Sequence, residues 1–254
     1  MLDGARIAVV VPAFDVAPRI VGVLGTLPAF VDDVIVVDDG SADRTAAVAR
    51  DARSPAGRVT VVSHASNRGV GAAIATGYIA ALARDADVIA VMAGDGQMDP
   101  DDLGRVVGRV VSGGCDYAKG NRLAHRDVLR AMPLSRLIGN VVLSALTRVA
   151  TGLWHIGDSQ CGYTAVHRRV LVALDPSAMW TRYGYPNHLL GALALRGFRV
   201  SDVTVRPVYA GERSGVRVRD AVVTIPRILL AIAAARASVR GHRLQAPRGF
   251  VEIR

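Results

Sequence analysis

Short apolar runs and longer helical stretches alternate along the first half of the chain. The apolar runs are continuous and rich in β-branched residues, which is typical of strands buried on both faces of a sheet. We expect these strands at residues 7–11, 34–37, 59–62 and 88–92. We expect helices at residues 19–27, 45–51 and 71–83. Repeated strand–helix–strand units predict an α/β fold, a mostly parallel sheet with helices on both faces.

The pattern changes after about residue 112, where long amphipathic stretches replace the short alternation. Here we expect helices at residues 133–151, 189–195 and 220–239, a polar turn at 158–164 and a late strand at 200–208. The last of these helices is apolar but carries Arg227 and Arg236, and a basic tail follows at residues 240–254. The second half of the chain therefore differs from the first in the spacing of its apolar residues and in its basic residues near the end of the sequence.

Polar residues stand after each of the four early strands, at residues 12–15, 38–41, 64–67 and 94–97. In parallel sheets, ligands bind beyond the carboxyl ends of the strands. We therefore expect a ligand site at this edge. No histidine pair has the spacing of a zinc site, and His64, which follows the third strand, is expected near a bound nucleotide.

The composition favours an anionic partner. The formal net charge is +9, with 51% hydrophobic and 21% charged residues, which excludes a disordered chain. Aromatic residues make up only 5%, and the arginines are scattered along the chain, so we expect no nucleic-acid partner. No run of eighteen apolar residues and no leader pattern is visible. We expect a cytoplasmic protein whose two cysteines, Cys115 and Cys161, are reduced.

Three motifs at the predicted strand ends carry chemistry. Residues 67–73 open a helix with two glycines, which suits a bound anion or tight packing better than a dinucleotide, since the third glycine is missing. Asp38-Asp39-Gly40-Ser41 is either a turn with a helix cap or a site for a base or ribose. Asp95 and Gln97 lie on one side of an extended segment and suit Mg²⁺, whereas Asp99 before Pro100 suits a helix cap.

Taken together, these motifs resemble glycosyltransferase family 2, the nucleotide-sugar enzymes of GT-A fold. The resemblance follows the chain in order through residues 10–15, 36–45, 67–73 and 93–97. Two later segments, Lys119-Gly120-Asn121-Arg122 and 158–163, resemble the branch that transfers sugars to polyprenyl phosphates. Two departures stand out: Ala93 replaces the first acid of the metal motif, and Asp15-Val16 replaces the usual Asn-Glu pair.

The resemblance implies a role for each matched residue. The expected nucleotide-sugar ligands are Pro12, Phe14, Asp15, Asp39, Asn67, Gly71, Asp95 and Gly96. Asp95 and Gln97 would hold Mg²⁺ or Mn²⁺ against the diphosphate, and Lys119, Arg122 and Arg136 would bind the acceptor phosphate. Asp158 and Arg122 are the expected catalytic residues. Asp158 would act as general base on a hydroxyl acceptor, or would orient an acceptor that is already an anionic phosphate.

The resemblance also divides the chain. Residues 1–212 would form the GT-A domain, with a nucleotide-sugar half at 1–112 and an acceptor half at 113–212. Residues 213–254 would form a C-terminal amphipathic helix and basic tail.

We expect an inverting transferase that moves a sugar from a nucleotide-diphosphate sugar to a polyprenyl phosphate. The helices near 134–149 and 221–239 would lie on the anionic inner face of the cell membrane, or would serve packing or a homo-oligomer interface. A glycan hydroxyl, in polysaccharide or antigen synthesis, is the competing acceptor. Because Ala93 weakens the metal motif, a non-catalytic nucleotide-sugar-binding protein is a third alternative.

Overall fold

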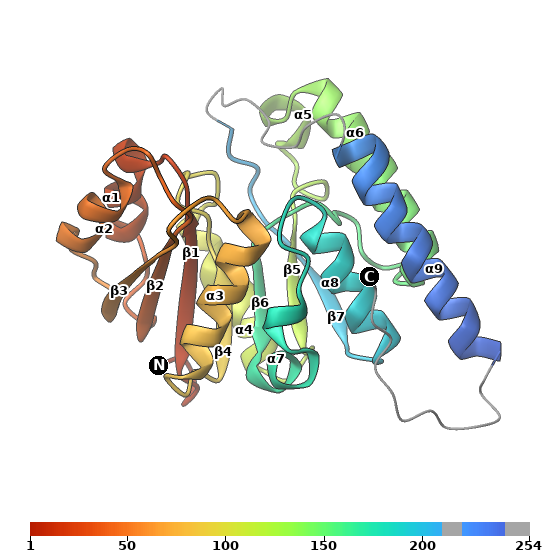
Figure 1. Cartoon of the computed structure of the whole chain (residues 1–254), viewed down its shortest axis with the longest axis horizontal. Helices are drawn as coiled ribbons and strands as arrows, with labels where there is room; N and C mark the ends of the chain where they lie inside the picture. The colour runs from red at the N-terminus through yellow and green to blue at the C-terminus, as the bar shows by residue number, and fades with distance from the viewer. Residues whose placement is uncertain (210–219, 242–254) are drawn as a thin grey trace.

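The computed structural model describes residues 1–209 and 220–241. Within these residues, seven strands form one sheet in the order β3-β2-β1-β4-β6-β5-β7 (Figure 1). The strands are β1 (Ile7–Ala13), β2 (Asp33–Asp38), β3 (Arg58–Ser63), β4 (Val88–Val91), β5 (Tyr117–Asn121), β6 (Thr164–His167) and β7 (Val200–Thr204). The α/β class with a mostly parallel sheet is therefore confirmed.

Helices flank both faces of the sheet. They are α1 (Ala17–Gly25), α2 (Thr45–Asp51), α3 (Val70–Leu82), α4 (Leu103–Val111), α5 (Val128–Ala131), α6 (Leu134–Thr151), α7 (Arg168–Leu174), α8 (Tyr185–Leu195) and α9 (Ile225–Gly241). Short 3-10 turns occupy Pro100–Asp102 and Pro176–Ala178, and a π-helical turn, Asp220–Thr224, leads into α9.

Alternate residues of each central strand serve two separate cores. Val9 and Val11 of β1 face the core formed with α1, α2 and α4, while Ala8 and Val10 face the core formed with α3, α7 and α8. A parallel strand buried on both sides needs apolar residues at every position. This requirement explains the continuous apolar runs that predicted β1, β2 and β4, whereas β3, at the edge of the sheet, is only partly buried.

Strand β6 runs opposite to its neighbours. It pairs antiparallel with both β4 and β5, whereas β5 pairs parallel with β7. The segment that enters β6 therefore lies at the same sheet edge as the segments that leave the other strands. This reversal brings residues 158–163 to the edge where the sequence places the ligand site.

Several elements of the second half differ from the expectations. Strands β5 and β6 and helices α4 and α7 were not predicted from the sequence. The late strand ends at Thr204 instead of residue 208. It ends there because the next residues bond elsewhere: Arg206 N donates to Asp102 Oδ2 at 2.6 Å, and Pro207 pairs with Met98.

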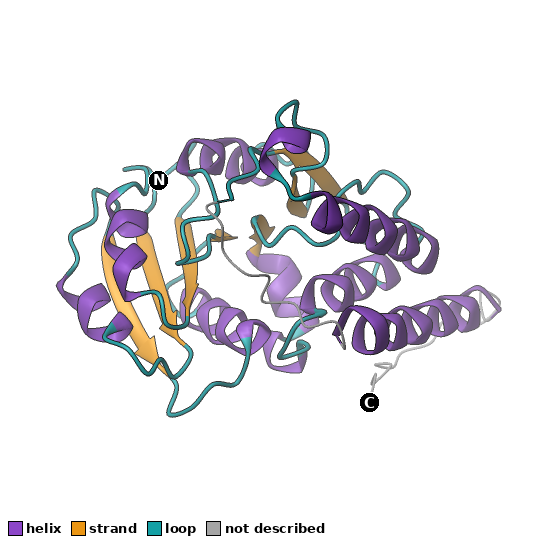
Figure 2. Cartoon of the chain, turned by 90° about the horizontal axis from the view of Figure 1, so that it is seen from above, coloured by secondary structure: helices purple, strands orange, loops and turns teal. Residues whose placement is uncertain are grey.

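Helices α6 and α9 lie side by side along one flank of the molecule, as both views show (Figures 1 and 2). Ile225, Ile228, Leu229 and Ile232 of α9 are buried in a small core with Ala150 of α6. α9 also packs against α8, where Gly191 leaves room for Ile232. Within the described residues, none of the helices is both long and apolar enough to cross a membrane. The predicted boundary at residue 212 and the tail from 242 onward lie outside the described residues.

Candidate active site

The loops at one edge of the sheet gather the predicted site residues. This edge receives the carboxyl ends of the parallel strands and the segment that enters β6. Figure 2 shows the molecule from above, so that the carboxyl end of β1 points toward the viewer. The site has two parts, one beside β1–β4 and the other beside β5–β7.

Carboxylates tie the loops after β1 and β2 together. Asp15, which has a positive φ of 51°, accepts hydrogen bonds from Ala42 N at 2.8 Å and Asp43 N at 3.3 Å. Ser41 bonds back to Asp38 through its hydroxyl and its N–H. Nearby, Phe14 is exposed, and the carbonyl of Pro12 accepts a bond from Gly94 N at 3.1 Å. These contacts give the loop a defined shape next to the surface where a nucleotide is expected.

Asp39 is buried and fully engaged inside the protein. Its carboxylate accepts hydrogen bonds from Arg68 N at 2.9 Å and Gly69 N at 2.7 Å, and it lies 2.7 Å from His64 Nδ1. The other ring nitrogen of His64 lies 2.9 Å from Thr76 Oγ1 on α3. Asp39 therefore shapes the loop that carries Asn67, whatever contact it makes with a ligand. Asn67 itself is exposed at this edge.

The glycines at the start of α3 face protein backbone. A Cβ atom on Gly71 would lie 2.0 Å from the carbonyl oxygen of Trp180, and one on Gly69 would lie 2.5 Å from that of Thr181. Ala72 N donates to the Thr181 carbonyl at 3.0 Å. Of the alternatives for this motif, tight packing therefore accounts for both glycines, and the second half of the chain covers the beginning of α3.

Asp95 and Gln97 lie in the loop after β4, where Gly96 has a positive φ of 76° that favours glycine. Gln97 N donates to Asp95 Oδ1 at 3.0 Å, and both side chains are partly exposed. Among the described residues, no three histidine, cysteine or acidic side chains form a metal-binding cluster. One carboxylate and one amide oxygen still fit Mg²⁺ or Mn²⁺ where substrate phosphates supply further oxygens.

A pocket of about 480 Å³ opens beside this loop. Gly96, Asp99, Ala131 and residues 206–209 contribute to its walls. Asp99 caps the turn that follows, because its side chain accepts from Asp101 N at 3.0 Å, so the cap interpretation of Asp99 is confirmed. The pocket thus connects the expected metal loop to the segment that follows β7.

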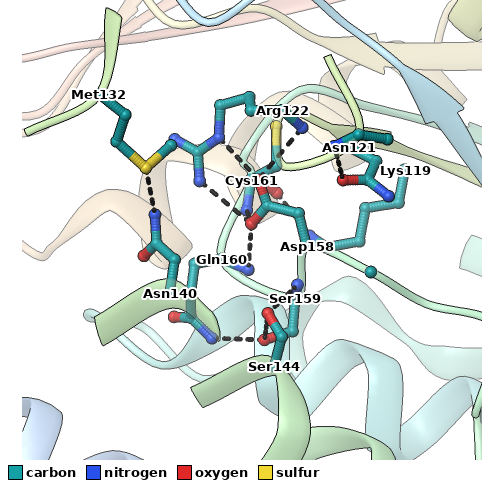
Figure 3. A network of polar contacts seen from close by, with 12 residues as sticks. Lys119, Asn121, Arg122, Met132, Asn140, Ser144, Asp158, Ser159, Gln160 and Cys161 are labelled. Atoms are coloured by element: carbon teal, nitrogen blue, oxygen red, sulfur yellow. Dashed lines mark hydrogen bonds and ion pairs between the residues drawn. The ribbon is translucent and has the colours of Figure 1, made fainter. Parts of the chain in front are cut away.

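Arg122 and Asp158 form a buried ion pair at the second part of the site (Figure 3). Arg122 Nε donates to Asp158 Oδ2 at 2.8 Å and Arg122 Nη2 to Oδ1 at 3.1 Å. The backbone N–H groups of Gln160 and Cys161 also donate to Oδ1, each at 3.1 Å. Burial raises the pKa of Asp158, but Arg122 and then Lys119 more than offset it, so the pKa is lowered overall. Asp158 is therefore ionised, and both its carboxylate oxygens accept hydrogen bonds from the protein.

A second layer of charge lies behind this pair. Lys119 is fully buried and donates to the carbonyl of Cys161, and burial lowers its pKa. Asp202 Oδ2 accepts from Asn121 Nδ2 at 2.7 Å and from Gly157 N at 2.6 Å. Lys119 therefore supports the loop from inside, through the carbonyl of Cys161. Asp202 was not predicted as a site residue from the sequence. The pattern of polar and apolar residues in β7 does not show that this carboxylate accepts a bond from Gly157 in the loop before β6.

Arg136 joins this part of the site through Tyr209. Its guanidinium carbon lies 5.3 Å from the centroid of the Tyr209 ring, and Arg122 Nη1 donates to the Tyr209 hydroxyl at 3.2 Å. The structure thus brings Arg122 and Arg136 to one aromatic side chain. Tyr209 was not predicted from the sequence, since a single tyrosine after a strand carries no pattern.

The model of one protein family, described as Glycosyl transferase family 2, matches residues 8–174. This chain belongs to glycosyl transferase family 2. The fold, the family and the glycosyltransferase activity expected from the motifs are therefore confirmed.

Curated relatives place the chain near enzymes of lipid-phosphate glycosylation. The polyprenol monophosphomannose synthase of Mycolicibacterium smegmatis is 32% identical over 86% of this chain and 80% of its own length. The undecaprenyl-phosphate mannosyltransferase of Micrococcus luteus is 30% identical, covering 87% of this chain and 93% of its own. A UDP-N-acetylglucosamine–dolichyl-phosphate N-acetylglucosaminyltransferase of Methanococcus voltae is 27% identical over 80% of this chain and 86% of its own length. The expected relation to polyprenyl-phosphate sugar transferases is confirmed.

Solved structures support the fold. Glucosyl-3-phosphoglycerate synthase from Mycobacterium tuberculosis, crystallised with Mn²⁺, UDP and glucosyl-3-phosphoglycerate, superposes with a TM-score of 0.66. The match covers 92% of this chain and 81% of that one at 21% identity. The likeness confirms a GT-A architecture for the glycosyltransferase.

Proposed function

We propose that this enzyme transfers a sugar, with inversion, from a nucleotide-diphosphate sugar to a polyprenyl phosphate at an anionic membrane surface. One observation supports the proposal: helix α6 carries an arginine, Arg136, and an exposed apolar face together. Arg136 stands in its first turn beside Arg122 and Tyr209. An exposed apolar stripe begins in the same turn and runs along the helix through Leu134, Ile138, Val141, Val142, Leu146 and Val149.

The spacing of this stripe follows the helical period, so its members lie on one face of α6. The exposed Leu129 of α5 lies just before it, and exposed or partly exposed Arg126, Arg130 and Arg148 accompany it. An apolar face flanked by arginines suits the boundary between headgroups and acyl chains. A lipid phosphate bound at Arg122 and Arg136 would then have its chain beside an apolar surface.

The state of Asp158 supports a phosphate acceptor over a glycan hydroxyl. A hydroxyl acceptor needs a base that can take its proton, with a pKa near the working pH. Asp158 has a lowered pKa, and both its oxygens are engaged with Arg122 and backbone N–H groups. A polyprenyl phosphate is already an anion and needs no base. Asp158 would therefore hold Arg122 in place, and Arg122 would hold the acceptor.

On the donor side, Asp95 and Gln97 would hold Mg²⁺ or Mn²⁺, which neutralises charge on the leaving diphosphate when bound. Asp15, Asp39 and Asn67 would shape the nucleotide site, with Pro12, Phe14, Gly71 and Gly96 in its surroundings. Residues 1–112 would thus bind the donor and residues 113–212 the acceptor. The pocket of about 480 Å³ between the two halves is where we place the reacting groups.

The membrane surface of this proposal differs from the one expected from the sequence alone. The main apolar side of α9 is buried against α6 and α8 and is unavailable to lipid. Arg236 donates to the carbonyl of Val149 at 3.1 Å rather than reaching outward. The stripe on α6 stays exposed, as do Val222, Val223 and Leu230.

The acceptor is tested by incubating the purified protein with a panel of nucleotide-diphosphate sugars and Mn²⁺. Polyprenyl phosphate, a glycan mixture or no acceptor is then added. We expect sugar transfer to polyprenyl phosphate only, sensitive to a chelator. Transfer to the glycans with polyprenyl phosphate inert would overturn the proposal.

The membrane surface is tested by co-sedimentation with anionic and neutral liposomes across a salt series. Leu134→Glu and Ile138→Glu should reduce binding to anionic liposomes at low salt. Val172→Glu is the matched control, because Val172 of α7 is 69% exposed and Leu134 is 68% exposed. Equal binding by all variants and the wild type would exclude the stripe as the membrane contact.

A further inference from the structure

A short segment after β7 connects the two parts of the site; we call residues 205–209 the closing segment. Arg206 is fixed to the loop after β4 by its N–H bond to Asp102 Oδ2, and its Nη1 lies 3.5 Å from Asp99 Oδ2. Pro207 forms an isolated bridge with Met98. The position of the closing segment is therefore set by the loop that carries Asp95.

Tyr209, the last residue of the closing segment, contacts two cations that come from different elements. Arg122 follows the end of β5, and Arg136 lies in the first turn of α6. The tyrosine hydroxyl accepts from Arg122 Nη1 at 3.2 Å, and the ring lies under the Arg136 guanidinium at 5.3 Å. Tyr209 thus brings together two side chains that would otherwise repel each other.

The chemistry of this contact leaves the positive charge intact. A hydroxyl oxygen and a π face attract guanidinium groups without carrying a formal charge. Burial raises the pKa of the Tyr209 hydroxyl, so it stays neutral at physiological pH. Asp158 compensates Arg122, and the pair of arginines with that one carboxylate keeps a net positive charge.

We propose that Tyr209 is a positioning residue for the acceptor phosphate, holding Arg122 and Arg136 ready without cancelling their charge. The inference rests on the proposed function, since it requires an acceptor that carries a phosphate. Fixing both arginines before the ligand arrives reduces the ordering that binding must bring about. A carboxylate at the same place would hold the arginines as well but would compete with the phosphate.

The test separates the hydroxyl, the ring and the charge with Tyr209→Phe, Tyr209→Leu and Tyr209→Glu. We expect Tyr209→Phe to raise the KM for polyprenyl phosphate about tenfold, because one hydrogen bond to a charged group is lost. Tyr209→Leu should raise it about fiftyfold, since the ring contact is lost as well. Tyr209→Glu should weaken binding at least as strongly as Tyr209→Leu. The KM for the donor and the melting temperature of Tyr209→Phe should stay at wild-type values.

Direct binding of a short prenyl phosphate, measured by calorimetry without donor, gives an independent readout. Tyr183→Phe serves as the control, because Tyr183 is another partly exposed tyrosine. If wild type binds the prenyl phosphate and Tyr209→Phe binds it equally or more tightly, the assignment of Tyr209 is wrong while the proposed acceptor stands. If wild type binds no prenyl phosphate, the proposed function fails and the inference fails with it.

Discussion

Two acidic centres at the same sheet edge have opposite environments. Asp95 lies in an open loop, is partly exposed and accepts a hydrogen bond from Gln97 N. Asp158 is fully buried and accepts five hydrogen bonds, two from the Arg122 guanidinium and three from the backbone N–H groups of Arg122, Gln160 and Cys161. A carboxylate that must coordinate an arriving ion needs oxygens that a ligand can reach. A carboxylate that must hold another side chain still is best saturated and dry.

The two carboxylates are the same residue type, so only their environments distinguish them. Under the proposed function, Asp95 would exchange partners during the reaction, whereas Asp158 would keep the same partners throughout. Mutation should therefore separate the two centres: one should affect turnover with little effect on folding, and the other should affect folding first. The predictions below test this separation, from the largest expected effect to the smallest.

Asp158→Ala should have the largest effect, because it leaves the Arg122 guanidinium buried without its partner. Breaking a buried pair in this way costs about 3–5 kcal/mol of unfolding free energy. Urea denaturation followed by circular dichroism measures the loss. Asp51→Ala, at an exposed acid of α2, is the control and should change stability by less than about 0.5 kcal/mol. If Asp158→Ala lost no more stability than the control, Asp158 would not be needed to hold Arg122 in place.

Asp95→Ala should leave the fold intact and lower turnover about 100-fold or more, roughly the loss expected when a main electrostatic stabiliser is removed. Initial rates at saturating donor and Mn²⁺ measure the effect, with the melting temperature as a check on folding. Near-normal turnover in a well-folded variant would show that the open loop does not act on the diphosphate.

The pH dependence of stability should sharpen the contrast. The pKa of Asp158 is lowered in the folded state from its usual 3.8. Its ionised form therefore stabilises the fold above pH 3.8, and this contribution is lost as the pH falls through the lower folded value. The stability difference between wild type and Asp158→Asn should be constant from pH 7 to about pH 5 and then shrink on acidification. A difference that grew on acidification would contradict the direction of the shift.

Ala93→Asp should have the smallest effect. It adds a carboxylate near Asp95, where the family motif has an acid, and an added oxygen ligand should strengthen Mn²⁺ binding. We expect the Mn²⁺ concentration at half-maximal activity to fall severalfold, with little change in the maximal rate. Activity that responds neither to Mn²⁺ nor to a chelator, in both wild type and variant, would exclude a metal at this loop.

The same contrast explains what the sequence could predict. Strands β1, β2 and β4 are buried on both faces almost throughout, so their apolar runs are unbroken and visible. Strand β3 lies at the edge of the sheet and is only partly buried, and its β-branched run at residues 59–62 is still visible. Strand β5 reads Tyr-Ala-Lys-Gly-Asn, and its lysine and asparagine are buried because each has a polar partner. No hydropathy pattern shows a strand whose polar side chains are satisfied by residues about forty and eighty positions away.

The candidate site divides in a similar way. The loops after β2 and β4 carry short acidic motifs whose residue types indicate a ligand site in the sequence itself. The structure places both loops at one edge of the sheet, as expected. Tyr209 and Asp202 contact Arg122, Arg136 and Asn121, which lie far away in the sequence. Such residues become visible only when the reversed strand β6 and the closing segment are placed in space.

The contact between Arg236 and α6 has a consequence for the order in which parts of the chain fold during synthesis. Arg236 donates to the carbonyls of Val149 and Ala150 in the last turn of α6, where Gly152 ends the helix in a left-handed conformation. The partner of those carbonyls is synthesised more than eighty positions later. The apolar side of α6 that α9 covers is likewise buried only after α9 has been synthesised. On the ribosome, residues 1–112 can therefore fold first. The side of α6 that α9 covers stays open to solvent and to chaperones until the residues of α9 have been synthesised.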